Sequence, residues 1–270
     1  METKLSIPFT FTVTTFNILA PIYKRQGVVK RECNYLDIYM KRNIEVLKVL
    51  AEVENPDVIS LQELWLDKSL IGLFNDKYSE KYNFYHRTRS YQSEGIGLFI
   101  NKKYKVDKVA EFNHPYSGRP FLFAFLNVCE GKQLIISTVH LTFCDEQERI
   151  MEIEVIIDTL KEMVKSPLVC GIIFTGDFNS TRDSIIIQKL LAAGLQSSYQ
   201  VIHGQEPKIT HRDHRGIESA CDFVFFQALR GSEVKPVLSQ VHPTCYSSET
   251  WPEEFTASDH RMISTEFHVH

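Results

Sequence analysis

The chain has 270 residues, of which 43% are hydrophobic and 24% charged, a composition typical of a globular protein whose core needs no disulfide or metal to stabilise it. The formal net charge of −4 and the pI near 6.2 exclude a protein that holds nucleic acid by bulk positive charge. Scattered cysteines without a CxxC pair, and an N-terminus without an apolar leader, indicate a reduced intracellular protein. We therefore expect a cytoplasmic protein, with the nucleus as a second location, and no membrane insertion.

Strand-like and helical patterns alternate along the chain. Residues 9–18 alternate apolar side chains with threonines and predict a strand. Residues 37–54 predict a helix, because apolar residues recur there at helical spacing. The apolar stripe of this helix consists of Ile38, Ile44, Leu47, Leu50 and Ala51. Further helices are predicted for residues 66–80, 145–165 and 183–193, the last capped by Gly194.

Short apolar runs between turn residues predict many more strands. They are residues 58–63, 84–88, 95–101, 105–112, 121–128, 133–141, 171–179, 221–226, 234–241 and 262–269. Many strands, few helices and no regular βαβ alternation predict an α/β protein with two packed, mostly antiparallel or mixed sheets flanked by helices. No low-complexity linker divides the chain, so we expect a single domain over residues 1–270.

Acidic, amide and imidazole side chains lie next to the buried strands, mostly where a strand ends. These residues are Asn17, Glu63, His140, Asp177, Asn179, Asp259 and His260. An ionisable group beside an apolar run is costly unless it is paired or bound to a metal. Any one of them alone would be read as a cap or a turn residue. Together they predict a single cleft, because strand ends in a layered fold meet at one edge.

The types of residue in this set also point to a chemistry. Hard oxygen ligands without a Cys–His cluster suit magnesium, manganese or calcium rather than zinc. Such a cation can polarise a phosphoryl oxygen, while histidines and a free carboxylate activate water. The chain has neither a P-loop nor a G-x-S-x-G turn, which excludes a P-loop nucleotidase and a serine hydrolase of that type.

Several short motifs carry a family resemblance. They are TFNIL (15–19), SLQELW (60–65), STVHL (137–141), TGDFNS (175–180), CDFVFF (221–226) and SDH (258–260). In this order and over nearly the whole chain, they resemble the signature segments of the endonuclease/exonuclease/phosphatase superfamily, which has a DNase I-like fold. The resemblance implies a four-layer α/β sandwich and hydrolysis of a phosphoester with Mg²⁺ or Mn²⁺. It also implies a metal site with Glu63 as the principal ligand and Asn17 and Asp259 beside it.

The resemblance implies roles for the remaining residues as well. Asp177 would orient or deprotonate the attacking water, and Asn179 would hold that water or a phosphate oxygen. His260, paired with Asp222, would face the scissile phosphate, and His140 would donate to a non-bridging oxygen. Either Asp177 or the His260–Asp222 pair could be the general base, and the sequence leaves both open.

The motifs also point toward particular branches of the superfamily. GDFNSTRDSIIIQKLL (176–191) resembles the deadenylase and nocturnin branch, with Thr181-Arg182 departing from its usual Pro-containing segment. TFNILAPIYKR (15–25), LQELW (61–65) and THRDHRG (210–216) are most similar to uncharacterised members best known from plants. The tryptophan of LQELW is also similar to that of neutral sphingomyelinases. The signature of inositol-polyphosphate 5-phosphatases is absent from the sequence.

The segment 211–216 is the most distinctive local feature. A solvated polar turn would explain it in most proteins, but here it precedes Asp222, where related enzymes place a loop that faces the substrate. We expect Arg212 or Arg215 to contact a substrate phosphate, since a guanidinium suits bidentate phosphate binding. His211 and His214 complete this predicted substrate-binding set. Aromatic residues that could stack on a base are Tyr91, Tyr116 and Phe143, although core packing is the better expectation for Phe143.

The leading prediction is an enzyme that cleaves a phosphodiester in RNA or another nucleotide-containing substrate, as a 3′ exonuclease or deadenylase does. The alternatives are a sphingomyelinase-like lipid phosphodiesterase and a nucleotide phosphatase. The sequence has no basic amphipathic helix or long apolar insertion to seat the protein on a bilayer, which argues against the lipid enzyme. A catalytically inactive binding module is the least favoured prediction, because none of the residues expected to act is missing.

Overall fold

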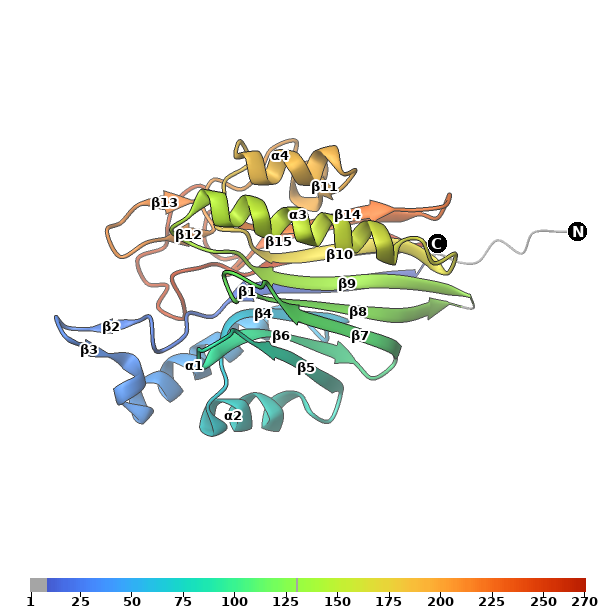
Figure 1. Ribbon diagram of the computed structural model, residues 1–270. Helices are drawn as coiled ribbons and strands as arrows, with labels where there is room; N and C mark the ends of the chain where they lie inside the picture. Colours follow the sequence, from blue (N-terminus) through green and yellow to red (C-terminus); the bar gives the residue numbers. More distant parts are fainter. Residues whose placement is uncertain (1–8, 130) are drawn as a thin grey trace, which may run out of the picture.

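The computed structural model describes residues 9–129 and 131–270. Two six-stranded mixed sheets pack face to face, and helices cover their outer faces (Figure 1). The order in the first sheet is β15 (Val234–Val241), β16 (Ile263–Val269), β1 (Phe9–Asn17), β4 (Val58–Trp65), β6 (Glu94–Asn101) and β5 (Tyr82–Thr88). The order in the second sheet is β11 (Gln196–Ser197), β14 (Asp222–Ala228), β10 (Val169–Asp177), β9 (Lys132–His140), β8 (Pro120–Cys129) and β7 (Lys105–Asn113).

The helices form the two outer layers. Helices α1 (Leu36–Leu50) and α2 (Lys68–Tyr78) cover the first sheet, and α3 (Glu146–Met163) and α4 (Ile185–Ala192) cover the second (Figure 1). Shorter elements are η1 (Glu32–Asn34), α5 (Ser198–His203) and the two-stranded ribbons β2 (Arg25–Gln26) with β3 (Lys30–Arg31) and β12 (His211–Arg212) with β13 (Glu218–Ser219). The four-layer α/β sandwich predicted from the sequence is confirmed. Among the described residues, no helix is long and apolar enough to cross a bilayer.

Strand β9 illustrates why the sheets are buried on both faces. Leu134 and Ile136 belong to the apolar cluster between the sheets, whereas Ile135 and Val139 belong to the cluster under α3 and α4. Successive side chains of a strand point to opposite faces, so a strand covered on both sides must be apolar at nearly every position. This is why the central strands read as continuous apolar runs in the sequence.

The predicted apolar stripe of the first helix is confirmed for Leu47 and Leu50, which pack in the core, and is wrong for its other members. Ile38 and Ile44 are 37% and 45% exposed, and the helix ends at Leu50 rather than at residue 54. Its buried face includes Arg42 and Asn43 as well as apolar residues. Arg42 lies inside because Glu32 neutralises its guanidinium and three backbone carbonyls accept its remaining hydrogens. Apolar spacing could not reveal a face that is built around a buried ion pair.

The strand directions determine where polar side chains converge. β1 runs parallel to β4, and β9 runs parallel to β10. The carboxyl ends of parallel strands lie at the same edge of a sheet, so His140 comes to the same edge as Asp177. Asn17 ends β1 in the other sheet and meets them there through its hydrogen bond to Asp177. Strand β14 is antiparallel to β10 and begins at that edge with Asp222.

Candidate active site

Three polar residues of the second sheet lie side by side where its central strands meet the edge. Asp177 is the register partner of His140 on β9 and of Asp222 on β14. Asn17 joins them from the first sheet, because its Nδ2 donates to Asp177 Oδ2 at 2.9 Å and to Glu63 Oε1 at 3.3 Å. The amide of Asn17 therefore connects the two sheets at the site.

Glu63 occupies a bulge in β4 that turns it out of the regular strand. The pairing of β4 with β6 shifts register between Leu61 and Leu64, and Glu63 has a φ of 53°, a left-handed conformation that is strained for a residue with a Cβ. Its Oε2 accepts a hydrogen bond from the backbone N–H of Ala20 at 2.9 Å. The irregular backbone thus holds one carboxylate at the mouth of the gap between the sheets.

The carboxylates around Glu63 favour the binding of a cation. Burial, together with the carboxylates of Asp259 and Glu94, raises the pKa of Glu63 to about 8. Carboxylates gathered in this way, with Asn17 beside them, supply the hard oxygen ligands that Mg²⁺ and Mn²⁺ prefer. The side chains present therefore fit a divalent metal at this position, where Glu63, Asp259 and Asn17 would hold it.

His260 lies between two carboxylates. Its Nδ1 is 3.0 Å from Asp222 Oδ2, and its Nε2 is 3.6 Å from Asp177 Oδ2. Burial disfavours a charged imidazole, but the two carboxylates outweigh this effect and raise the pKa of His260 well above its ordinary value. Thr210 Oγ1 donates to Asp222 Oδ2 at 2.6 Å and holds that carboxylate in place. His260 is therefore a fixed, positively charged imidazolium.

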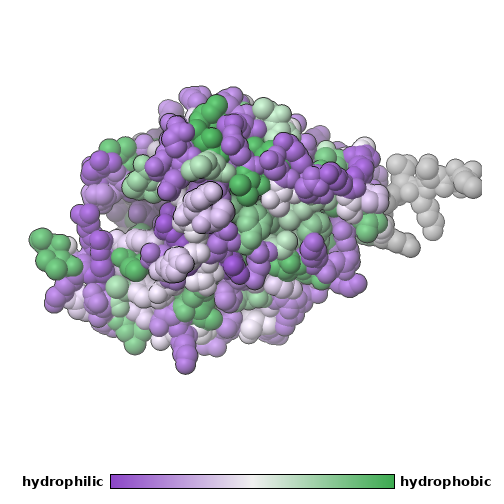
Figure 2. Space-filling view, viewed as in Figure 1, coloured by the Kyte–Doolittle hydropathy of each residue, from purple (hydrophilic) through white to green (hydrophobic). Residues whose placement is uncertain are grey.

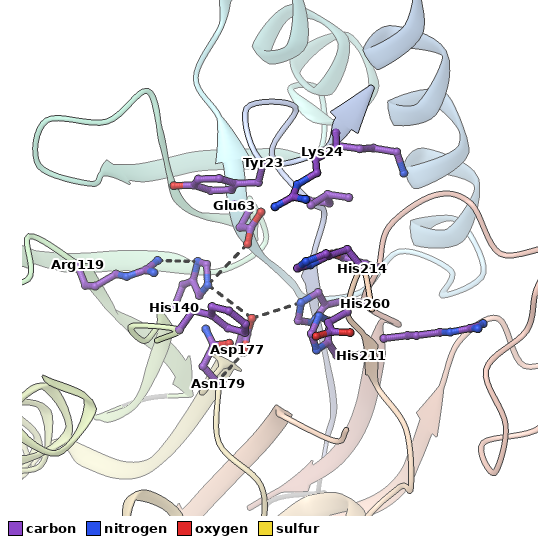
Figure 3. Close-up of a pocket in the computed structure, with 16 residues that line it drawn as sticks. Tyr23, Lys24, Glu63, Arg119, His140, Asp177, Asn179, His211, His214 and His260 are labelled. Carbon is purple, nitrogen blue, oxygen red and sulfur yellow. Dashed lines mark hydrogen bonds and ion pairs between the residues drawn. The ribbon is translucent and has the colours of Figure 1, made fainter. Parts of the chain in front are cut away.

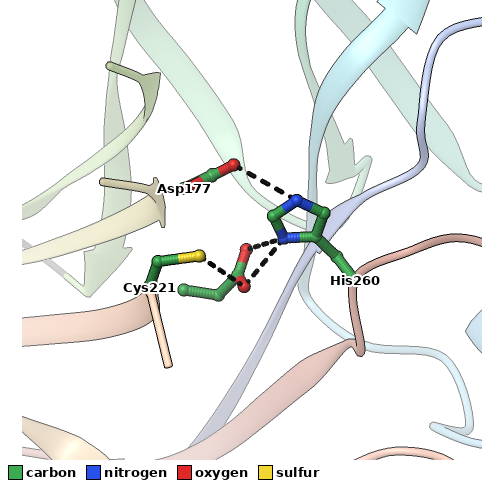
Figure 4. A group of neighbouring side chains, drawn as sticks. Asp177, Cys221 and His260 are labelled. Carbon is green, nitrogen blue, oxygen red and sulfur yellow. Dashed lines mark hydrogen bonds and ion pairs between the residues drawn. The ribbon is translucent and has the colours of Figure 1, made fainter. Parts of the chain in front are cut away.

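Cys221 completes a compact group with these three residues (Figure 4). The potential ligand atoms of Asp177, Cys221, Asp222 and His260 lie within 4.8 Å of one another, a separation that could suit a metal. However, a cysteine sulfur is a soft ligand that suits zinc or copper rather than Mg²⁺ or Mn²⁺. Asp222 is already bonded to His260 and Thr210. The oxygen-rich side of the cleft at Glu63 is the better metal site.

His140 is neutral, whereas His260 is positively charged. Burial and the nearby guanidinium of Arg119 hold the pKa of His140 well below its ordinary value. Arg119 Nη1 lies 3.1 Å from His140 Nδ1, and a guanidinium can only donate, so Nδ1 accepts and Nε2 carries the hydrogen. That Nε2 lies 3.6 Å from Asp177 Oδ2 and 3.8 Å from Glu63 Oε1. His140 thus presents a neutral N–H donor to the centre of the site.

Asn179 follows β10 in a left-handed conformation with a φ of 48°. Its backbone N–H donates to Asp177 Oδ1 at 2.8 Å, and its Nδ2 donates to the carbonyl oxygen of Leu141 at 2.8 Å. These bonds fix both Asp177 and the orientation of the Asn179 amide. The turn TGDFN therefore positions two polar side chains with one backbone conformation.

Most of these groups line one cleft of about 470 Å³ (Figure 3). The residues predicted from the sequence that line it are Glu63, His140, Asp177, Asn179, His211, Arg212, His214, Asp259 and His260. Asn17 and Asp222 lie behind this surface and contact the lining residues through the hydrogen bonds given above. Arg215 lies outside the lining, with its Nε donating to Asp213 Oδ2 at 2.9 Å.

The two residues that begin segment 211–216 both line the cleft. The ring of His211 stacks on that of His260 with centroids 4.2 Å apart. Burial and the charge of His260 lower the pKa of His211 to about 4, so it is neutral beside the imidazolium. Arg212 reaches the cleft, but Glu253 and Glu218 accompany its guanidinium.

Some lining residues were not predicted from the sequence. Arg119 directly precedes β8, which is antiparallel to β9 and so begins at the edge where β9 ends. The rule applied to strand ends could have found Arg119 if strand direction had been known. Tyr23, Lys24 and Arg25 come from the β2–β3 region. The expectation that Phe143 packs in the core is wrong, since it is 53% exposed and lines the cleft.

Comparison with known proteins identifies the family. Residues 15–260 match the model of the Endonuclease/Exonuclease/phosphatase family. The chain belongs to this family. The resemblance read from the short motifs is thereby confirmed. Enzymes of this family hydrolyse phosphoesters, and carboxylates and histidines of the kind that such hydrolysis needs line the cleft of this chain.

Relatives within the family are distant. An uncharacterised calcium-binding protein of Arabidopsis thaliana is 29% identical over 264 residues, which cover 84% of this chain and 54% of the relative. The chain thus spans about half the length of this curated relative. The human nocturnin catalytic domain with bound sulfate shares 18% identity at a TM-score of 0.73, covering 97% of this chain and 94% of that chain. Danio rerio TDP2 in complex with a single-stranded DNA product shares 20% identity at a TM-score of 0.70, covering 96% and 98%. At these identities, the two structures establish the fold.

Proposed function

We propose that this enzyme hydrolyses a phosphodiester in single-stranded RNA, or in another nucleotide-containing substrate, from the 3′ end. The observation that carries the proposal is the set of cationic and aromatic side chains that line the cleft around Glu63, Asp177 and His260, which together form its wall. Phe143 is half exposed in the cleft, and Lys24, Arg25 and Arg119 line the same cleft. An exposed aromatic ring offers a surface on which an unpaired base can stack, and cations attract a phosphate chain. The TDP2 complex with a single-stranded DNA product supports a strand-binding role for this fold.

Two exposed tyrosines extend this polar and aromatic wall. Tyr91 and Tyr116 are 103% and 84% exposed. Their loops are joined, because the N–H of Ser90 donates to the carbonyl oxygen of Gly118 at 3.0 Å. Arg119, which lines the cleft, follows directly on the second loop. Rings displayed on loops that are fixed to one another favour a substrate with unpaired bases over a free phosphate monoester.

The proposed metal ligands are Glu63, Asp259 and Asn17, and the proposed cation is Mg²⁺ or Mn²⁺. When bound, the cation supplies polarisation of the phosphoryl oxygen and offsets negative charge on the leaving oxygen. Asn17 also donates to Asp177, so the same side chain fixes the position of the carboxylate that faces the reacting phosphate.

The charge states of the remaining groups indicate which one acts as the general base, which stabilises the transition state and which donates a hydrogen bond. His260 is held as a cation by Asp222, so it suits electrostatic stabilisation of a pentacoordinate transition state at phosphorus better than removal of a proton. Burial and Asp222 raise the pKa of Asp177, although His260 opposes them. A carboxylate with a raised pKa is the better base near neutral pH. We therefore assign water activation to Asp177, and donation to a non-bridging oxygen to the Nε2–H of His140.

A substrate panel tests this proposal. Purified protein with Mg²⁺ or Mn²⁺ is incubated with 5′-labelled RNA ending in oligo(A), single-stranded DNA, phosphorylated nucleotides and sphingomyelin, with Glu63→Ala as the inactive control. We expect progressive shortening of the RNA from its 3′ end, absent in the control. Release of phosphate from nucleotides with intact RNA would replace the proposal with a nucleotide phosphatase. Product from sphingomyelin alone would replace it with a lipid phosphodiesterase.

A further inference from the structure

The β2–β3 hairpin projects from the body of the protein at the rim of the cleft. It stands apart at the left of Figure 1, and its tip forms the hydrophobic projection at the left edge of Figure 2. The tip consists of Val28 and Val29, which are 101% and 87% exposed. Aliphatic side chains this exposed are surrounded by water in the free protein, and two adjacent ones on a projecting turn suggest that something covers them.

The hairpin holds its valines away from the body. Arg25 pairs with Arg31 and Gln26 with Lys30 across the ribbon, and Gly27 has a φ of 75° that suits the turn. At the base, the N–H of Glu32 donates to the carbonyl oxygen of Lys24 at 2.9 Å. The stem therefore has a defined attachment, and the apolar tip cannot lie against a core of its own.

The charge of the hairpin differs from that of the whole chain. Residues 24–31 contain four cations and no acid, within a chain of net charge −4. The first acidic residue after them, Glu32, is buried and paired with Arg42 at 2.7 Å. Arg25, Lys30 and Arg31 are exposed. The hairpin thus combines an apolar tip with a basic stem whose charge no neighbouring carboxylate within the ribbon cancels.

We propose that the β2–β3 hairpin docks the enzyme on an anionic lipid surface. A bilayer with anionic headgroups has negative charge at its surface and apolar chains just beneath, in the same order as the basic stem and the valine tip. A polynucleotide would match the cations but would leave the aliphatic tip uncovered, and Val28 and Val29 offer no ring for base stacking. Docking in this way is peripheral and does not depend on which phosphoester the cleft hydrolyses.

The docking would orient the active site. Lys24 and Arg25 belong to the hairpin region and also line the cleft, so the side of the cleft that they form would lie next to the membrane. Glu32, at the end of the hairpin, pairs with Arg42, which in turn donates to the carbonyl oxygens of Ile18 and Leu19 beside the site. The hairpin is therefore tied to the active-site backbone rather than to a remote part of the fold.

Vesicle flotation tests the proposal. The full-length protein is mixed with phosphatidylcholine vesicles with and without phosphatidylserine, and binding is compared with that of Val28→Ser/Val29→Ser and Lys30→Gln/Arg31→Gln. A matched control, Leu168→Ser/Val201→Ser, removes two aliphatic side chains that are 46% and 48% exposed on other elements. Unchanged hydrolysis of a small soluble phosphodiester, or unchanged circular dichroism, establishes that each variant is folded.

We expect the wild type and the control to float only with vesicles that contain phosphatidylserine. The valine variant should bind about tenfold more weakly, and each lost cation should weaken binding about fivefold. Absence of flotation with phosphatidylserine, or equal flotation of the valine variant, would overturn the proposal. If the lysine–arginine variant instead loses affinity for RNA in the absence of vesicles while vesicle binding is absent, the hairpin binds nucleic acid and the lipid assignment is wrong.

Discussion

Replacing Glu63 with glutamine should stabilise the metal-free protein while abolishing its activity. The pKa of Glu63 rises from 4.5 to about 8 in the folded state, and each pKa unit corresponds to about 1.4 kcal/mol. An acid whose folded pKa is raised stabilises the fold only below its unfolded pKa, and that contribution is lost as pH rises toward the folded value. At about pH 7, Glu63 ionises freely in the unfolded chain but stays largely protonated in the metal-free fold. This difference destabilises the fold by about 3 kcal/mol.

Glutamine removes the charge but gives up part of the hydrogen bonding. Glu63 accepts from the N–H of Ala20 and from Nδ2 of Asn17, and an amide oxygen can retain only one of these contacts, a loss of about 1 kcal/mol. The net gain is about 2 kcal/mol, which corresponds to a rise in Tm of about 4–8 °C for a chain of this size. The gain should be absent near pH 4.5 and grow toward about pH 8.

Thermal unfolding at a series of pH values, in EDTA, measures this effect. Glu162→Gln, which changes an exposed glutamate on α3, is the matched control and should not alter the pH dependence of Tm. Added Mg²⁺ should raise the Tm of the wild type but not that of Glu63→Gln, since only the wild type retains the principal ligand. If Tm depended on pH in the same way for the wild type and Glu63→Gln, the conclusion that carboxylates are crowded around Glu63 would be refuted.

Three other substitutions give separate outcomes. Arg42→Ala should lower the free energy of unfolding by about 3–5 kcal/mol in urea titrations, because it leaves Glu32 buried without a counter-ion; a loss near zero would contradict this. Phe143→Ala should raise KM for an RNA oligonucleotide by about tenfold and leave a small phosphodiester unaffected, and equal effects on both would rule out stacking. Arg212→Ala should raise KM or lower kcat, and a change below about twofold would exclude a phosphate contact.

The sequence could predict that many residues of the candidate site lie together, because their positions follow from strand geometry. Asn17, His140 and Asp177 each end a buried strand, and parallel strands bring such ends to one edge. A polar residue at the end of an apolar run is visible in a linear sequence. The pairing of parallel and antiparallel strands makes the cleft continuous, and it is visible only in the fold.

The residues that escaped prediction depend on contacts between distant segments. Arg119 directly precedes a strand rather than ending one, and its place at the site depends on β8 lying beside β9 in the opposite direction. The buried face of α1 includes Arg42, whose burial depends on Glu32 and on the carbonyl oxygens of Ile18 and Ala257. Apolar periodicity reports burial against other apolar residues, so it assigns such a face to solvent.

Direct metal binding is the measurement that bears most closely on the central claim, that the cleft at Glu63 is a divalent-metal site for phosphoester hydrolysis. Mn²⁺ is titrated into EDTA-treated wild-type protein and into Glu63→Gln, with binding followed by electron paramagnetic resonance and calorimetry. We expect the wild type to bind Mn²⁺ and to release protons on binding near neutral pH. Excess Mg²⁺ should displace the bound Mn²⁺, and the variant should bind Mn²⁺ far more weakly. Equal binding by both proteins would place the metal elsewhere and contradict the site described here.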